Sequence, residues 1–231
     1  MDEKARRTIV CIDYGTTGTG MVILPPMFSM LADNMPGKKA VSYILDGEAI
    51  EFISEWPSRT SAIGNGFTEA FKVPSQVSYL QNWPSRSPWG FLVTPEMQAY
   101  TWTKLLLDAN LQRDEFTDEV LQKISHLGVM HLPPGKSAVH IIAVFLHRLF
   151  EHIVERLEIV IGHHDAFQQT PVDLWFTIPA SWSRDTRDLM HEAIKRAGLT
   201  ANPFVRIYTM PEPEAAALSV MQTLVEKFQV S

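Results

Sequence analysis

The stretch TIVCIDYGTTGTGMVIL, residues 8–24, decides the fold. Thr8–Ile12 is a short apolar run rich in β-branched side chains, which predicts a buried strand. Residues 13–20 read as a turn rich in glycine and threonine, and Met21–Leu24 predicts a second strand that two prolines stop. The stretch therefore predicts a β-hairpin with a glycine and threonine tip.

The tip of this hairpin carries residue types that suit phosphate. Gly15 and Gly18 let the backbone approach a phosphate closely, and successive amides at such a turn form an anion-binding nest. Thr16 and Thr17 add hydroxyl donors, and the carboxylate of Asp13 at the strand end can hold waters around Mg²⁺. Taken alone, such a motif is more often an ordinary turn, and no Gly-Lys-Ser/Thr follows to make it a Walker A loop.

The C-terminal seventy residues alternate between strand and helix patterns. Residues 172–178 predict a strand that Pro179 ends, and residues 183–197 predict a helix with Ser183 as its N-cap and Gly198 just past its end. Strand 205–210 and helix 212–228 follow. This order predicts an α/β fold in which helices cover a mixed or parallel sheet.

The middle of the chain is less regular. The longest periodic segment, residues 137–162, predicts a helix that Ser137 caps. The other expected elements are a strand at 50–56 closed by Pro57, a flexible surface insertion at 57–71, a strand at 74–80, and helices at 96–108 and 115–124.

Composition and charge narrow the function classes. The chain has 231 residues and a net charge of -6, whereas a nucleic-acid-binding protein more often has a basic excess. Apolar runs are broken well before the ~20 residues that span a bilayer. The single cysteine, Cys11, fits a reducing compartment. We therefore expect no nucleic acid or membrane partner, and a cytoplasmic or nuclear location.

Two further segments stand where strands give way to helices. Residues 176–183 (FTIPASWS), with Arg187 beyond, combine a strand end, a rigid proline and a capped helix. Residues 210–217 (MPEPEAAA) place Glu212 at the start of an alanine-rich helix, where an acid is favourable with the helix dipole.

In this order and spacing, the three segments resemble the ATPase domain of DnaK-type (seventy-kilodalton heat-shock) chaperones, which belongs to the actin-like ATPase class. Residues 12–17 resemble the first phosphate hairpin of that family. Residues 177–180, with Trp182 and Arg187, resemble its "TVPA" segment, and residues 212–217 resemble its "EPTAAA" helix start. Weaker landmarks are residues 73–75, 89–90 and 104–106. The tryptophans and the "EPEAAA" variant are similar to the divergent heat-shock twelve-A-like branch.

The resemblance implies an actin-like ATPase lobe, with a mixed β-sheet flanked by helices in a ribonuclease-H-like motif and a smaller helical subdomain. Residues 1–231 would form a single N-terminal lobe, with a core of about 8–24 plus 170–228 and an inserted subdomain of about 50–165. The second lobe and the substrate-binding domain would be absent from this chain.

The resemblance also implies roles for named residues. Asp13 and Glu212 would hold Mg²⁺ through water, and the backbone and hydroxyl groups of Gly15, Thr16, Thr17 and Gly18 would hold the phosphates of ATP or ADP. Pro179 and Arg187 would relay the nucleotide state. Glu212 is the one catalytic candidate. On this basis, Asp13→Asn would abolish Mg-ATP binding.

Two departures leave hydrolysis open. The family places a catalytic lysine shortly after the position of Gly90, but residues 91–94 read FLVT and no lysine follows until Lys104. The second phosphate hairpin and the adenosine-binding glycines of the family lie beyond the position of Ser231. We therefore expect weak nucleotide binding with little or no hydrolysis by this chain alone.

Two alternatives remain beside this interpretation. The chain could be a non-catalytic truncated paralogue or fragment that acts through protein contacts, with partners at the face where the second lobe docks. Alternatively, residues 13–19 also resemble the hairpin of sugar and acid kinases of the actin-like class, although the segments at Pro179 and Glu212 argue against that group.

Overall fold

The predicted hairpin is present in the computed structural model of the chain, which describes residues 7–24, 51–61, 64–108, 129–161 and 170–216. Strands β1 (Thr8–Tyr14) and β2 (Gly18–Leu24) pair antiparallel, with Tyr14 opposite Thr19 at the tip. Alternate β1 side chains are buried, because one face of the strand packs on the core. The turn itself is Gly15, Thr16 and Thr17.

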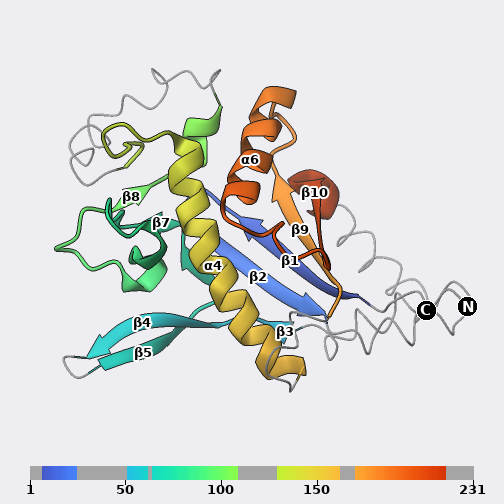
Figure 1. Ribbon diagram of the computed structural model, residues 1–231, viewed down its shortest axis with the longest axis horizontal. Helices are drawn as coiled ribbons and strands as arrows, with labels where there is room; N and C mark the ends of the chain where they lie inside the picture. The colour runs from blue at the N-terminus through green and yellow to red at the C-terminus, as the bar shows by residue number, and fades with distance from the viewer. Residues whose placement is uncertain (1–6, 25–50, 62–63, 109–128, 162–169, 217–231) are drawn as a thin grey trace, which may run out of the picture.

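The hairpin forms the centre of a mixed sheet (Figure 1). Strand β9 (Val172–Ile178) pairs parallel with β1, and β10 (Val205–Pro211) pairs parallel with β9. On the other side, β3 (Glu51–Phe52) and β6 (Lys72–Pro74) both pair antiparallel with β2. The strand order is β10-β9-β1-β2-β3, which confirms the predicted α/β class with a mixed sheet.

Two described helices cover one face of this sheet (Figure 1). Helix α4 (Ala138–Ile161) buries the predicted stripe of Ile142, Leu146, Leu149, Ile153 and Leu157. Among the described residues, no helix combines the length and the apolar character needed to cross a bilayer.

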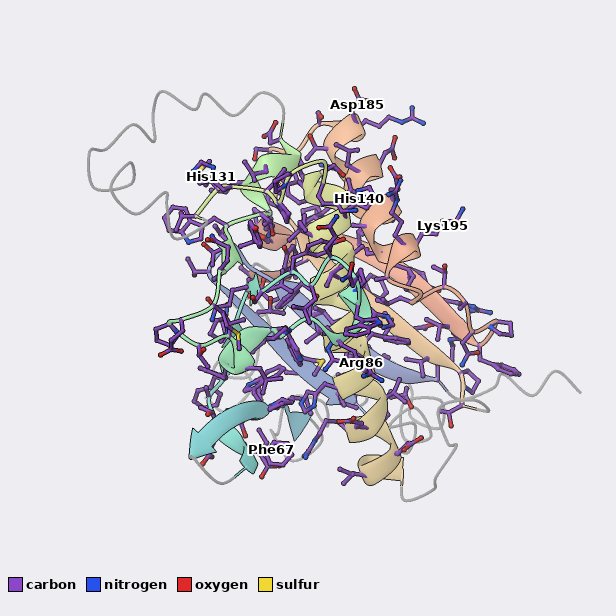
Figure 2. All side chains as sticks on the ribbon, turned by 60° about the vertical axis from the view of Figure 1, so that its left-hand side comes forward. Phe67, Arg86, His131, His140, Asp185 and Lys195 are labelled. Carbon is purple, nitrogen blue, oxygen red and sulfur yellow. The ribbon has the colours of Figure 1, made fainter. Side chains whose placement is uncertain are left out.

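Helix α6 (Arg184–Arg196) confirms the predicted capping. The Ser183 hydroxyl accepts a hydrogen bond from the Thr186 amide, and Gly198 has a φ of +85° just past the helix end. Asp185 lies in the first turn and Lys195 in the last (Figure 2), so each charge complements the helix dipole at its end.

Residues 57–71, expected to be a flexible surface insertion, contain regular strands. These residues instead form most of a two-stranded ribbon of β4 (Glu55–Ser61) and β5 (Gly64–Glu69). Trp56 is fully buried at its base and donates a hydrogen bond from Nε1 to the carbonyl of Ala70 at 2.7 Å, while Phe67 is exposed (Figure 2). The strand continues through Pro57 because a two-stranded ribbon consists of edge strands, where proline is tolerated.

The expected helix at 96–108 was wrong. These residues contain only strand β8 (Tyr100–Thr101) and the 3-10 helix η3 (Leu105–Leu107) as regular structure. Trp102 has a φ of +58°, which breaks a helical path, and burial of Thr103 and Lys104 overrides local helix propensity.

The rest of the region between β5 and α4 is built from short elements. The expected strand at 74–80 is divided between β6 and β7 (Gln76–Val77), and 3-10 helices η1 (Pro84–Arg86) and η2 (Gly90–Leu92) follow. Helix α4 is therefore the long helix of the expected helical subdomain at about 50–165, and its other described residues form strands and 3-10 turns. The helix expected at 115–124 lies outside the described residues, as does the helix expected at 212–228 beyond residue 216.

An aromatic cluster joins α4 to both the sheet and the ribbon. The Phe145 ring lies 5.6 Å from Tyr14 of β1 and 5.8 Å from Trp89. His152 lies further along α4, and its ring centroid is 5.4 Å from that of Trp56. Its Nε2 donates a hydrogen bond to the carbonyl of Glu55 at 3.0 Å. Burial is the main factor that lowers the pKa of His152 to about 4.

We expect this histidine to make the protein less stable in acid. Between the unfolded pKa of 6.5 and the folded pKa of about 4, the unfolded chain binds a proton that the folded chain does not. Stability is full above the unfolded pKa and falls as the pH drops through this window, by about 2 kcal/mol at pH 5. Urea unfolding at neutral pH and at about pH 5 measures the effect.

The matched variant is His152→Gln, whose amide can still donate to the Glu55 carbonyl but does not titrate. The difference between wild type and variant isolates this one group from the other carboxylates and histidines. An unchanged pH dependence in the variant would show that His152 is not the group responsible.

Candidate functional site

Three parallel strands bring the predicted site segments to one edge of the sheet. The carboxyl ends of β1, β9 and β10 lie side by side, since all three strands run in the same direction. Asp13 stands near the end of β1, Pro179 directly follows β9 and Glu212 directly follows β10. Ligands of open α/β sheets commonly bind outside the carboxyl ends of the strands.

A cavity of about 280 Å³ opens at this edge. Five of the predicted site residues line it, together with three residues that were not predicted as site residues. The lining consists of Asp13, Gly15, Thr16, Pro179 and Glu212, with Lys104, Leu105 and Trp182. Of the other predicted residues, Thr17, Gly18 and Arg187 do not line the cavity.

The backbone conformation of the hairpin tip is fixed by close packing at Gly15 and by hydrogen bonds with Ser75. A Cβ added to Gly15 would lie 2.4 Å from the carbonyl oxygen of Gly18, so only glycine fits at this position without a backbone shift. The Ser75 amide donates to the carbonyl of Thr17 at 3.0 Å, and the hydroxyls of Ser75 and Thr19 are 2.8 Å apart. Ser75, which belongs to the segment at 73–75 noted in the sequence, thus holds the hairpin tip in place through these two contacts.

Asp13 is held by two donors. The Thr177 hydroxyl donates to Oδ1 at 2.8 Å, and the Lys72 ammonium donates to Oδ2 at 2.7 Å. Partial burial by itself raises the pKa of Asp13. The hydrogen bonds from Lys72 and Thr177 and the charges of Lys72 and Lys104 outweigh that effect, so the pKa lies below its ordinary value. Asp13 is therefore ionised at neutral pH.

Lys104 is the main site residue that the sequence reasoning missed. Only 4% of the residue is exposed, and its ammonium donates to Oε1 of Glu212 at 2.7 Å. The ammonium also lies 5.5 Å from the centre of the Trp182 ring and 5.9 Å from that of Tyr14. Lys104 and its neighbour Thr103 are both buried, so the ammonium group is held in place at the cavity wall.

The Tyr14 side chain fixes the segment that delivers Lys104. Its hydroxyl lies 3.3 Å from the hydroxyl of Thr103, and both groups are buried. Tyr14 is also the residue that follows Asp13, so the same strand end positions the carboxylate and the lysine.

Arg187 has an anchoring contact in the structure. Its guanidinium donates to the carbonyls of Ala180 and Trp182 at 3.3 and 3.2 Å. These bonds fix the turn between β9 and α6 and thereby place Trp182 against Lys104. Pro179 ends β9, as predicted, and lines the cavity.

The expected magnesium groups are already paired with lysines. Asp13 binds Lys72 and Glu212 binds Lys104, so a metal at either carboxylate would meet an ammonium group first. Within the described ranges, no three His, Cys, Asp or Glu side chains form a group that could hold a metal directly. The donor set thus does not fit a metal ion bound directly by these side chains.

Two larger cavities lie along α4, away from the hairpin. They measure about 500 and 420 Å³, and none of the predicted site residues lines either. The predicted segments meet instead at the smaller cavity.

No model of a known protein family matches the chain, and no curated protein matches it.

Proposed function

We propose that the cavity at the hairpin tip binds the phosphates of ATP or ADP. The observation that carries this proposal is the meeting of three distant segments around one buried lysine: the hairpin, the strand end at Pro179 and the helix start at Glu212. Phosphate needs close backbone approach, hydroxyl donors and fixed positive charge, which Gly15, Thr16 and Lys104 supply.

The size of the cavity favours weak binding. Pockets that enclose a drug-sized ligand measure about 300–1,000 Å³, so a volume of about 280 Å³ suits phosphoryl groups better than a whole nucleotide. The described residues offer one wall for the phosphates. Phosphoryl transfer requires a positioned and water-excluded site, so we propose binding with little or no hydrolysis by these residues alone.

We further propose that the fold is the first lobe of an actin-like ATPase domain of the DnaK-type chaperone family. Support comes from the order of the three motifs and from the mixed sheet, in which a hairpin strand pairs with the first of two later parallel strands. On this proposal, protein partners would contact the face that a second lobe covers.

Gly15→Ala tests the phosphate site directly. The added Cβ would lie 2.4 Å from the Gly18 carbonyl, so the tip must open and its amides lose their alignment. We expect ATP affinity to fall by about tenfold or more, which corresponds to the loss of one hydrogen bond to a charged group. Titration calorimetry with ATP measures this, and circular dichroism checks that the fold is retained.

Gly18→Ala is the matched control, because a Cβ there meets the Lys72 side chain at an ordinary distance of 3.4 Å. We expect it to bind ATP like the wild type. Equal affinity of wild type and Gly15→Ala, or no ATP binding by the wild type at millimolar concentration, would contradict the proposed function.

A further inference from the structure

Each acidic side chain of the cavity is neutralised by its own lysine. The Asp13 carboxylate meets the Lys72 ammonium at 2.7 Å, and the Glu212 carboxylate meets the Lys104 ammonium at 2.7 Å. The charges of the four side chains cancel, so the site is not the concentration of negative charge that a free divalent cation seeks.

The two lysines differ in how firmly they are held. The Lys104 side chain is 5% exposed and lies against two aromatic rings, so its ammonium is a fixed part of the wall. The Lys72 side chain is 55% exposed and pairs with a carboxylate that is itself 43% exposed. An ion pair as exposed as this one is weak, so a stronger anion can draw Lys72 away from Asp13 at little cost.

The β6–β2 pairing directs Lys72 to the site. Lys72 stands opposite Gly20, and its aliphatic stem lies over Gly18 and Gly20, at ordinary van der Waals distance from the position that a Cβ would take on either glycine. The ammonium therefore reaches Asp13 beside the hairpin tip. From this place it can turn to a phosphate oxygen while Asp13 keeps its bond from the Thr177 hydroxyl.

We infer that Lys72 and Lys104, rather than a divalent cation, supply the positive charge that holds a polyphosphate in this cavity. This inference rests on the proposed function and names its charge source. Magnesium gives up its water reluctantly and would have to displace Lys72 from Asp13 and approach a second ammonium. A polyphosphate instead gains two charge-assisted partners that are already present.

The test compares affinities with and without magnesium. ATP and inorganic tripolyphosphate are titrated into the full chain by calorimetry, in excess MgCl₂ and in excess EDTA at equal ionic strength. We expect the dissociation constant of each ligand in EDTA to lie within about threefold of its value in magnesium, a difference typical of exposed electrostatic contacts.

Asp13→Asn gives an opposite prediction for the two charge sources. If the carboxylate holds a magnesium ion, the substitution abolishes binding. On our inference it removes a negative charge beside the phosphates and frees Lys72, while the Asn oxygen can still accept from Thr177. We expect affinity in EDTA to be unchanged or to rise up to about fivefold, whereas Lys72→Met lowers it about threefold or more.

The outcomes separate the two proposals. Binding that EDTA removes and that Asp13→Asn abolishes would overturn the lysine inference and leave the nucleotide site standing. No binding of either ligand by the wild type under both conditions would overturn the proposed function, and the inference with it. Binding in EDTA that survives Asp13→Asn and weakens in Lys72→Met would support both.

Discussion

Lys104→Met is expected to lower the affinity for ATP by about 30-fold or more, because a charge-assisted hydrogen bond to phosphate is lost and the partner carboxylate becomes repulsive. Methionine has a similar length and keeps the packing between the Tyr14 and Trp182 rings. Removing one partner of a buried ion pair is costly when the other charge is left buried, but the Glu212 side chain is 42% exposed and water can solvate its carboxylate. We therefore expect the melting temperature to fall only slightly. Calorimetric titration with ATP and thermal unfolding of the same samples measure both effects.

Two further variants separate direct contact from overall charge. Lys136→Met removes a lysine of similar kind, whose ammonium lies 5.6 Å from the Tyr79 ring outside the cavity, and should bind ATP like the wild type. The double variant Lys104→Met/Glu212→Gln restores the neutral charge balance of the site but not the donor, so it should remain weak. Full recovery in the double variant, or wild-type affinity in Lys104→Met, would rule out a direct Lys104 contact.

The parts of the fold that the sequence predicts well are those with local signals. The β1–β2 hairpin has two β-branched runs around a glycine-rich tip, and α6 has a serine cap at one end and a glycine at the other. Strands β9 and β10 end at or beside prolines. Parallel strands end at a common edge, which is why Asp13, Gly15, Thr16, Pro179 and Glu212 line one cavity. The local signals predict the elements, whereas the grouping of these residues in one site came from the resemblance.

The lysines of the site could not be predicted, because their partners are distant in sequence. Lys104 is 108 residues from Glu212, and Lys72 is 59 residues from Asp13. Because residues 96–108 were expected to form a helix, nothing in the sequence set Lys104 apart from any other lysine on a helix. Its burial depends on Tyr14, Thr103 and Trp182, and on the positive φ of Trp102, none of which has a sequence signature.

The ribbon of β4 and β5 was missed for a related reason. Its sequence is rich in glycine, serine and threonine, which is typical of a loop, and Pro57 suggested a strand end. What holds its base is tertiary: the burial of Trp56 among Trp89 and His152 and its bond to the Ala70 carbonyl. Packing of this kind routinely overrides weak β-propensity.

One glycine of this poorly predicted region, Gly90, packs against the strand β6 that carries Lys72. Gly90 is the first residue of η2 and has a φ of +53°. Its carbonyl accepts a hydrogen bond from Nε2 of the Gln76 side chain at 3.0 Å. A Cβ at this position would lie 2.3 Å from Cγ2 of Val73. Val73 is a fully packed β6 residue opposite Thr19, between Lys72 and the segment that fixes the hairpin tip.

Gly90→Ala is therefore expected to lower the free energy of unfolding by about 2–4 kcal/mol. A left-handed backbone costs an alanine about 1 kcal/mol, and overpacking a core adds about 1–3 kcal/mol. Urea unfolding followed by tryptophan fluorescence measures the loss, since Trp56 and Trp89 lie in the affected core. Because β6 carries Lys72, the variant should also bind ATP more weakly under conditions where it is still folded.

Gly135→Ala separates the two causes. Gly135 also has a positive φ, of +70°, but nothing lies within 4 Å of the position that a Cβ would take, so this variant should lose only about 1 kcal/mol. Val73→Ala removes the clashing methyl group, so the double variant Gly90→Ala/Val73→Ala should be less destabilised than the sum of the two single variants. Equal losses in Gly90→Ala and Gly135→Ala, or strict additivity in the double variant, would show that the contact with Val73 is not what requires glycine. Non-additivity would place the packing of η2 on β6 among the interactions that hold Lys72 beside Asp13.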